Sequence, residues 1–194
     1  MNPTEILDER PLPEGLALDL LVISPDGGKV AFTGARGKEQ RVEVGSAAGE
    51  PFDEVGTPRF SPDGTTVAYR ARRGKREYMV VGTKKGKAYQ GVGWPVWGPG
   101  GAFAYYVLSG RSQALVAGGE IGEEYDCVSG TPAFSPDGSV VAYSARKGAK
   151  WFIVAGARKS EPYDAVSEPV FSGDAVVFAA VVDRRLLRLR LPIR

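Results

Sequence analysis

The tetrapeptide Ser-Pro-Asp-Gly occurs three times in this chain, at residues 24–27, 61–64 and 135–138. The first two copies begin 37 residues apart, and the second and third begin twice that distance apart. The missing copy stands at residues 98–101 as Gly-Pro-Gly-Gly, and a degenerate copy stands at 172–174 as Ser-Gly-Asp. A fixed period of this size indicates a repeat architecture, in which one small unit is stacked on the next.

Each Ser-Pro-Asp-Gly has the chemistry of a tight turn. Proline presets φ for the second position, aspartate can bond the backbone ahead of it, and glycine accepts the positive φ that follows. The motif is therefore predicted to join two antiparallel strands. Its serine is expected to have a structural role and not to act as a catalytic nucleophile.

The fourth repeat shows the unit most clearly. Four short apolar stretches, each bounded by turn residues, lie at 132–134, 140–143, 151–154 and 163–166. Four short strands per repeat, with a period of about 40 residues, are typical of a β-propeller blade. The fold class is therefore predicted to be all-β, a five-bladed β-propeller of four-stranded antiparallel blades in a single domain, with repeats near 16–55, 56–92, 93–128, 129–166 and 167–194.

The run Pro-Ala-Phe-Ser-Pro-Asp-Gly at 132–138, followed by Val-Ala-Tyr at 141–143, resembles the WD40-like (PD40) repeat of the TolB-type β-propellers. Related repeats build the propellers of prolyl oligopeptidases and tricorn-type proteases. The resemblance covers nearly the whole chain and implies a propeller fold, but no particular chemistry. The extra N-terminal domain of TolB and the hydrolase domain of prolyl oligopeptidases have no counterpart in the sequence.

The fifth repeat offers three strands and lacks a fourth. Residues 4–9 resemble the missing strand, so the N-terminus is expected to complete the last blade and close the ring. Blades one and five would then meet at a seam, where polar residues replace the apolar residues of the other blades. The seam residues are Arg41, Glu43, Arg188 and Arg190, with a solvated outer edge as the alternative location.

The loops between the second and third strands of each blade are basic, and they all emerge on one rim of a propeller. With Arg41 they hold 13 of the 25 lysines and arginines, against three acids. Such an excess attracts anionic partners, although an ordinary solvated surface is the alternative. The candidate partner-binding residues of this basic rim are Arg36, Lys38, Arg72, Arg73, Lys75, Arg76, Arg111, Arg146, Lys147, Lys150, Arg184 and Arg185.

The composition argues against the familiar hydrolase mechanisms. The chain has no histidine, which removes Ser-His-Asp and Cys-His schemes and the commonest transition-metal ligand. Asp53, Asp126 and Asp164 recur at one repeat position, which favours a structural role such as bonding to a neighbouring loop. The sequence therefore predicts no enzyme activity, no catalytic residues, no metal site and no cofactor.

These observations predict a non-catalytic binding or scaffolding propeller that contacts an acidic protein through the basic rim. Binding of an anionic ligand or a nucleic acid is the alternative, and an enzyme ranks third. No apolar run is long enough to span a bilayer, so no membrane contact is expected. The expected location is cytoplasmic if Met1 is the natural start, and periplasmic if a signal peptide has been removed.

Overall fold

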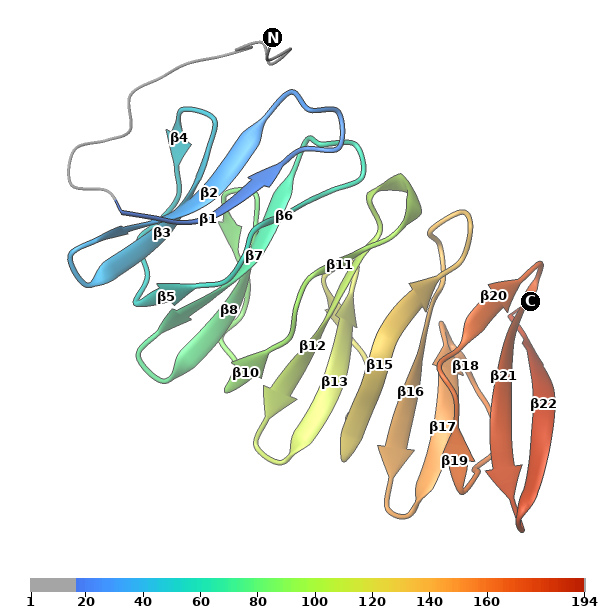
Figure 1. Ribbon diagram of the computed structural model, residues 1–194. Helices are drawn as coiled ribbons and strands as arrows, with labels where there is room; N and C mark the ends of the chain where they lie inside the picture. The colour runs from blue at the N-terminus through green and yellow to red at the C-terminus, as the bar shows by residue number, and fades with distance from the viewer. Residues whose placement is uncertain (1–16, 194) are drawn as a thin grey trace, which may run out of the picture.

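The computed structural model describes residues 17–193, with side chains described from residue 20 onward. Its elements are β-strands apart from one short 3₁₀ turn, η1 (Pro99–Gly101). The strands form five antiparallel sheets in chain order, which we call blades one to five. The all-β architecture of antiparallel blades expected from the repeats is confirmed. Figure 1 shows the blades along an open arc, with the blue first blade and the red last blade at opposite ends.

In each of the first two blades, strands A, B, C and D follow one another from the inner side of the arc outward. Blade one consists of β1 (Ala17–Ile23), β2 (Val30–Arg36), β3 (Glu39–Val44) and β4 (Ala47–Ala48). In blade two, strand A is split into two short segments that both pair with strand B. Its strands are β5 (Glu54–Val55), β6 (Arg59–Phe60), β7 (Val67–Arg73), β8 (Arg76–Val81) and β9 (Lys84–Lys85).

Blades three and four repeat this arrangement. Blade three consists of β10 (Gly91–Val92), β11 (Val96–Trp97), β12 (Phe103–Ser109), β13 (Ser112–Ala117) and β14 (Glu120–Ile121). Blade four consists of β15 (Cys127–Phe134), β16 (Val141–Lys147), β17 (Lys150–Ala155) and β18 (Arg158–Lys159). Blade five consists of β19 (Ala165–Val166), β20 (Val170–Ser172), β21 (Ala175–Val182) and β22 (Arg185–Pro192).

Strand D is extended by one aromatic residue in each of the first four blades. The aromatic residue bridges strand C in the pairs Gln40–Phe52, Glu77–Tyr89, Gln113–Tyr125 and Trp151–Tyr163. Strand A of the next blade starts directly afterwards, because the chain passes from D to A without a loop. Blades two to five therefore begin two residues before the boundaries predicted from the sequence, at Glu54, Gly91, Cys127 and Ala165.

Blade five ends on strand C. Its two A segments, β19 and β20, pair with β21, and β21 pairs with β22. No strand of the described residues pairs with the outer edge of β22. The predicted closing strand at residues 4–9 lies outside the described residues.

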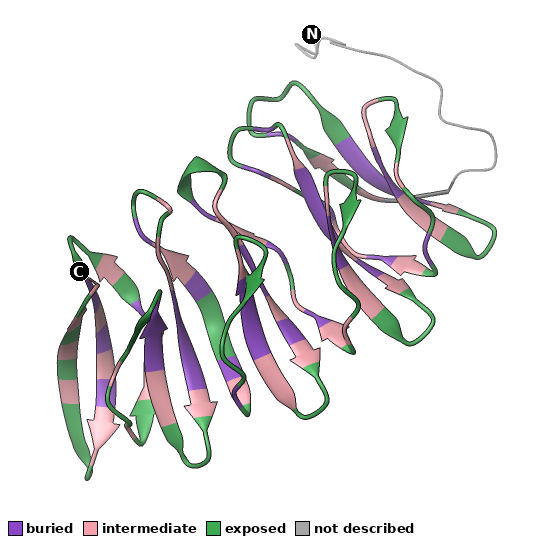
Figure 2. Ribbon diagram, turned by 180° about the vertical axis from the view of Figure 1, so that it is seen from behind, coloured by how far each residue is buried: buried purple, intermediate pink, exposed green. Residues whose placement is uncertain are grey.

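The core of the protein lies between the blades. Each of the four interfaces between neighbouring blades contains one apolar cluster, built from strands B and C of both blades. Figure 2 shows the same distribution, with buried segments concentrated on the middle strands of each blade. Apolar burial of this kind supplies the main favourable free energy of folding, so each blade is stabilised chiefly by its neighbours.

The predicted seam does not form among the described residues, because blades one and five lie at opposite ends of the arc (Figure 1). Each end instead makes an ion pair inside its own blade. Arg41 Nη2 lies 2.8 Å from Glu43 Oε1, and Arg190 bonds Asp174. Arg188 is exposed and makes no ion pair with a described residue.

Candidate functional site

The five hairpins that join strands B and C lie in a row along one edge of the arc, the lower edge in Figure 1. The row runs from the β2–β3 hairpin to the β21–β22 hairpin. Antiparallel pairing places these turns at one end of every blade, and the A–B and C–D turns at the other end. All twelve cations predicted for the basic rim lie on or beside these hairpins, and we call this surface the hairpin edge.

Four of the twelve cations form ion pairs with nearby carboxylates. Arg72 contacts Glu54 Oε2 through Nε at 3.1 Å and through Nη2 at 2.9 Å. The other three pairs are Arg73–Glu50 at 2.9 Å, Lys147–Glu123 at 3.2 Å and Lys150–Asp164 at 2.6 Å. Arg146 instead donates to the carbonyl of Gly148 at 2.8 Å. The charge of the hairpin edge is therefore partly neutralised, above all in blade four.

The remaining seven cations are exposed and make no ion pair with any residue from 17 to 193. They are distributed over four of the five blades, and we call them the free cations of the hairpin edge. These residues are Arg36, Lys38, Lys75, Arg76, Arg111, Arg184 and Arg185. Seven of the twelve candidate residues are therefore exposed and without an ion pair among the described residues.

In blades two to five, a side chain at one recurring repeat position accepts a hydrogen bond from the backbone of the B–C hairpin. Asp53 Oδ2 accepts a hydrogen bond from the backbone N–H of Gly74 at 2.6 Å, and Asp126 Oδ2 accepts one from Gly148 at 2.7 Å. In the same way, Gln90 accepts from Gly110 at 2.8 Å and Asp164 from Asp183 at 3.2 Å. The structural role expected for Asp53, Asp126 and Asp164 is therefore what these hydrogen bonds show. Gln90 completes the pattern in blade three.

The hairpin of blade five differs from the others in its backbone. The other four hairpins place a glycine with positive φ at the first turn position, which any tight two-residue hairpin favours. Blade five has Asp183 at this first position and Arg184 at the second, with φ of 48° and 60°. Residues with a Cβ rarely adopt this region. Arg184 is therefore kept at the tip of the hairpin at a conformational cost.

The Ser-Pro-Asp-Gly motifs form turns at the opposite edge, as predicted. Ser61 Oγ donates to Asp63 Oδ1 at 2.5 Å, and Ser135 Oγ donates to Asp137 Oδ1 at 2.6 Å. These hydrogen bonds, with others from the following residues, lower the pKa of each aspartate to about 2. Each serine hydroxyl donates to an ionised carboxylate, whose low pKa makes it a weak base.

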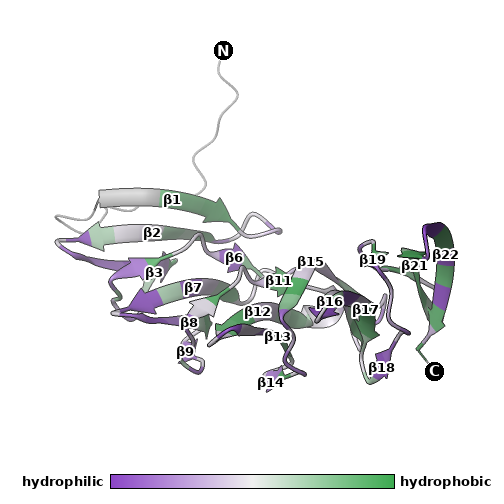
Figure 3. Cartoon of the chain, turned by 90° about the horizontal axis from the view of Figure 1, so that it is seen from below, coloured by the Kyte–Doolittle hydropathy of each residue, from purple (hydrophilic) through white to green (hydrophobic). Residues whose placement is uncertain are grey.

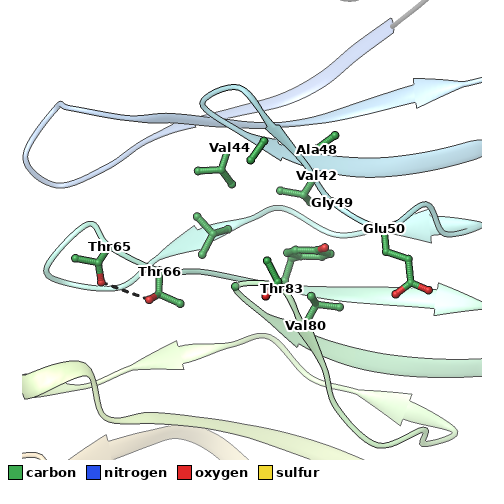
Figure 4. Close-up of a pocket in the computed structure, with 13 residues that line it drawn as sticks. Val42, Val44, Ala48, Gly49, Glu50, Thr65, Thr66, Val80 and Thr83 are labelled. Atoms are coloured by element: carbon green, nitrogen blue, oxygen red, sulfur yellow. Dashed lines mark hydrogen bonds between the residues drawn. The ribbon is translucent and has the colours of Figure 1, made fainter.

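A groove with a volume of about 340 Å³ lies between blades one and two. Figure 4 shows Val42, Val44 and Gly49 of blade one on one side and threonines of blade two on the other. The buried Tyr69 also lines the groove, and its hydroxyl makes no hydrogen bond with a described residue. Burial raises the pKa of Tyr69 to about 12, so this hydroxyl stays protonated at neutral pH.

The groove reflects small side chains at fixed repeat positions. A second groove of about 250 Å³ lies at the equivalent place between blades three and four. Between blades two and three the same space is filled, because Met79 and Phe103 replace the smaller Val42 and Val67. Aligning the repeats by residue size would have revealed the groove, which the sequence prediction missed.

An exposed tryptophan with two neighbouring arginines lies in the loop between β10 and β11. Trp94 is 48% exposed. The guanidinium groups of Arg70 and Arg59 lie 5.2 Å and 5.9 Å from its ring centroid. The described residues contain no cluster of carboxylates and cysteines able to hold a metal ion. They also contain no helix long and apolar enough to cross a membrane.

No protein-family model matches the chain, and no curated protein sequence does. The β-propeller domain of the Trilobed protease from Pyrococcus furiosus is similar in structure, with 15% identity and a TM-score of 0.49 over 91% of this chain and 70% of that one. TolB from Acinetobacter baumannii gives 17% and 0.45 over 91% and 54%. Oligogalacturonate lyase in complex with manganese gives 14% and 0.48 over 93% and 67%. The assignment of the fold rests on the five antiparallel sheets described above.

The prediction that the chain is not an enzyme, which was drawn from the missing histidine and the recurring aspartates, is contradicted by the comparison. The similar structures include oligogalacturonate lyase and, at 12% identity, acylaminoacyl peptidase from Pyrococcus horikoshii. At this level of identity the likeness shows the fold alone, and it assigns no activity to the chain.

Proposed function

We propose that this chain binds an acidic protein surface along the hairpin edge. The observation that carries the proposal is the row of seven exposed free cations on the tips of neighbouring hairpins. The hairpins of blades two to five are each fixed from beneath by a side-chain hydrogen bond, which supports a preorganised surface. Complementary charge of this kind steers association and fixes the register of two surfaces.

The backbone of Arg184 supports the same role. A glycine would relieve the positive φ of Arg184 at the second turn position, whereas the equivalent residues of the other four hairpins have no positive φ. Strain of this kind is typical of functional sites. Arg184 and the adjacent Arg185 place two free cations at the end of the row.

Carboxylates between the cations favour a protein over a nucleic acid. Glu54 lies within the hairpin edge beside Arg72, and the exposed Glu39 and Asp183 lie next to free cations. A phosphate backbone presents uniform negative charge and would be repelled by these carboxylates. A folded acidic protein can instead match alternating charges one by one.

The test uses poly-L-glutamate and a random-sequence DNA duplex as probes, each titrated over a range of salt concentrations. Replacing Lys75, Arg76, Arg184 and Arg185 by serine should weaken binding of poly-L-glutamate by about tenfold or more, with the unfolding midpoint nearly unchanged. The control replaces the exposed Lys84, at the opposite edge of blade two, and should bind normally. If the chain binds DNA more tightly than poly-L-glutamate, with a steep salt dependence, the proposal is wrong and the hairpin edge binds nucleic acid instead. Equal loss of binding in the control would also refute it.

A further inference from the structure

The two ends of the arc expose the faces that all other blades bury. Seven large apolar side chains are exposed among the described side chains, and five of them lie on these two end faces. Leu21, Ile23 and Val30 lie on blade one at 63%, 64% and 41% exposure. Val170 and Leu186 lie on blade five at 63% and 77%. Figure 3 shows the apolar second half of β1 at one end and the alternating colours of β22 at the other.

Strand pairing identifies which residues share each end face. On blade one, Glu43 pairs with Phe32 and Phe32 with Leu21, so Glu43 lies on the face turned away from blade two. On blade five, Arg188 pairs with Ala179 on the face turned away from blade four. Leu189, the next residue of β22, packs instead into the cluster shared with blade four.

The four interfaces inside the chain follow one rule. The fourth residue of each strand C and the fifth residue of the next strand C belong to the same apolar cluster. The pairs are Val42 with Val80, Met79 with Val116, Leu115 with Val154, and Ile153 with Leu189. Continuing the stack past blade five would bring the fourth residue of β22 against the fifth residue of a further β3. These two residues are Arg188 and Glu43.

The charges at these two positions are opposite, and each group keeps atoms without a partner among the described residues. Glu43 is only 5% exposed, and both contacts from Arg41 go to its Oε1 atom. Its Oε2 atom has no partner among the described residues. Arg188 is an exposed cation without an ion pair to any residue from 17 to 193. An apolar surface with an acid at its centre thus matches an apolar surface with a base at its centre.

We propose that the end face of blade five docks on the end face of blade one of a second copy of this chain, with Arg188 of one copy against Glu43 of the next. The contact continues the stacking that already joins the five blades. It buries the exposed apolar residues at both ends. Because it uses two different surfaces, it is heterologous, and copies add head to tail until a ring closes.

Sedimentation velocity over a range of protein concentrations tests the proposal. The wild-type chain should form species larger than one copy as concentration rises. Glu43→Lys and Arg188→Glu should each weaken association by more than about tenfold, because like charges then meet across the contact. Arg185→Glu is the matched control, since it changes the same charge on β22 but on the other face of the strand. It should associate like the wild type.

Mixing the two single variants distinguishes contact between copies from closure within one chain. In the mixture, the lysine introduced in one variant meets the glutamate introduced in the other, and the remaining contact is native, so association should return. Leu186→Ser removes an exposed apolar side chain without affecting the core and should also weaken association. The proposal is overturned if the wild type stays monomeric at every concentration, or if mixing restores nothing. The double variant carries Glu43→Lys and Arg188→Glu in one chain. The proposal is also overturned if this variant is more stable as a monomer than either single variant, because the two residues would then meet within one chain.

Discussion

The carboxylate of Asp53 is hydrogen-bonded to the backbone N–H of Gly74, 2.6 Å away, and ties the start of β5 to the tip of the β7–β8 hairpin. Asp126 and Gly148 repeat this bond at 2.7 Å in blade four. The two bonds join residues that are 21 and 22 positions apart in the chain. A side chain on the inner strand thereby fixes the loop that presents the cations.

Replacing Asp53 by Ala should lower the free energy of unfolding by about 1 kcal/mol, because a charge-assisted hydrogen bond is lost at an exposed site. The larger effect is expected on the hairpin itself. Hydrogen exchange at the amide of Gly74 should become faster than in the wild type, while the amide of Gly148 keeps its protection. The role assigned to Asp53 would be contradicted if the substitution left the exchange rate of the Gly74 amide unchanged.

Glu77 links blade two to blade three, because its Oε2 atom accepts a hydrogen bond of 2.8 Å from the backbone N–H of the buried Val92. Glu77→Ala leaves this N–H without a partner and should cost about 1–3 kcal/mol of unfolding free energy. Glu77→Gln keeps an acceptor, as Gln40 and Gln113 do at the equivalent positions, and should cost much less. Denaturant titration of both variants decides the matter, and an equal loss in the two would rule out the hydrogen bond as the cause.

Arg184→Gly should stabilise the fold by on the order of 1 kcal/mol, because glycine adopts the positive φ of this position without strain. The same substitution at Arg185, which lies in β22 with ordinary strand geometry, should destabilise the protein. Thermal unfolding of the two variants provides the comparison. If the hairpin edge binds acidic proteins, Arg184→Gly should also weaken that binding, so stability and affinity would change in opposite directions.

Stability should fall at alkaline pH. Burial raises the pKa of Tyr69, Tyr105 and Tyr143 to about 12, whereas an unfolded tyrosine titrates near 10. A raised pKa favours the protonated form in the folded state, so the contribution is fully present below about pH 10 and is lost as the pH rises from about 10 through 12. Urea unfolding at about pH 8 and pH 11 measures this loss of stability. The fall in unfolding free energy between the two pH values should be smaller for the double variant, Tyr69→Phe and Tyr143→Phe, than for the wild type. An identical difference would exclude these tyrosines as the source.

The sequence by itself determined the strands, the turns and their order. Turn chemistry is local: proline, aspartate and glycine in Ser-Pro-Asp-Gly define a hairpin within about five or six residues, and the period then places every copy. The recurrence of Asp53, Asp126 and Asp164 likewise indicated a shared structural role.

Only the tertiary structure decided which charges are free and which surfaces are exposed. Arg72 is neutralised by Glu54, 18 positions away, whereas Lys75 on the same hairpin has no ion pair with a described residue, and nothing in the local sequence separates them. The packing between blades also differs from one interface to the next, as at the equivalent residues Val42 and Met79. Ion pairing and packing depend on contacts between residues that are far apart in the sequence. Two blades must fit together, whereas the sequence pattern of one repeat describes the surface of only one blade.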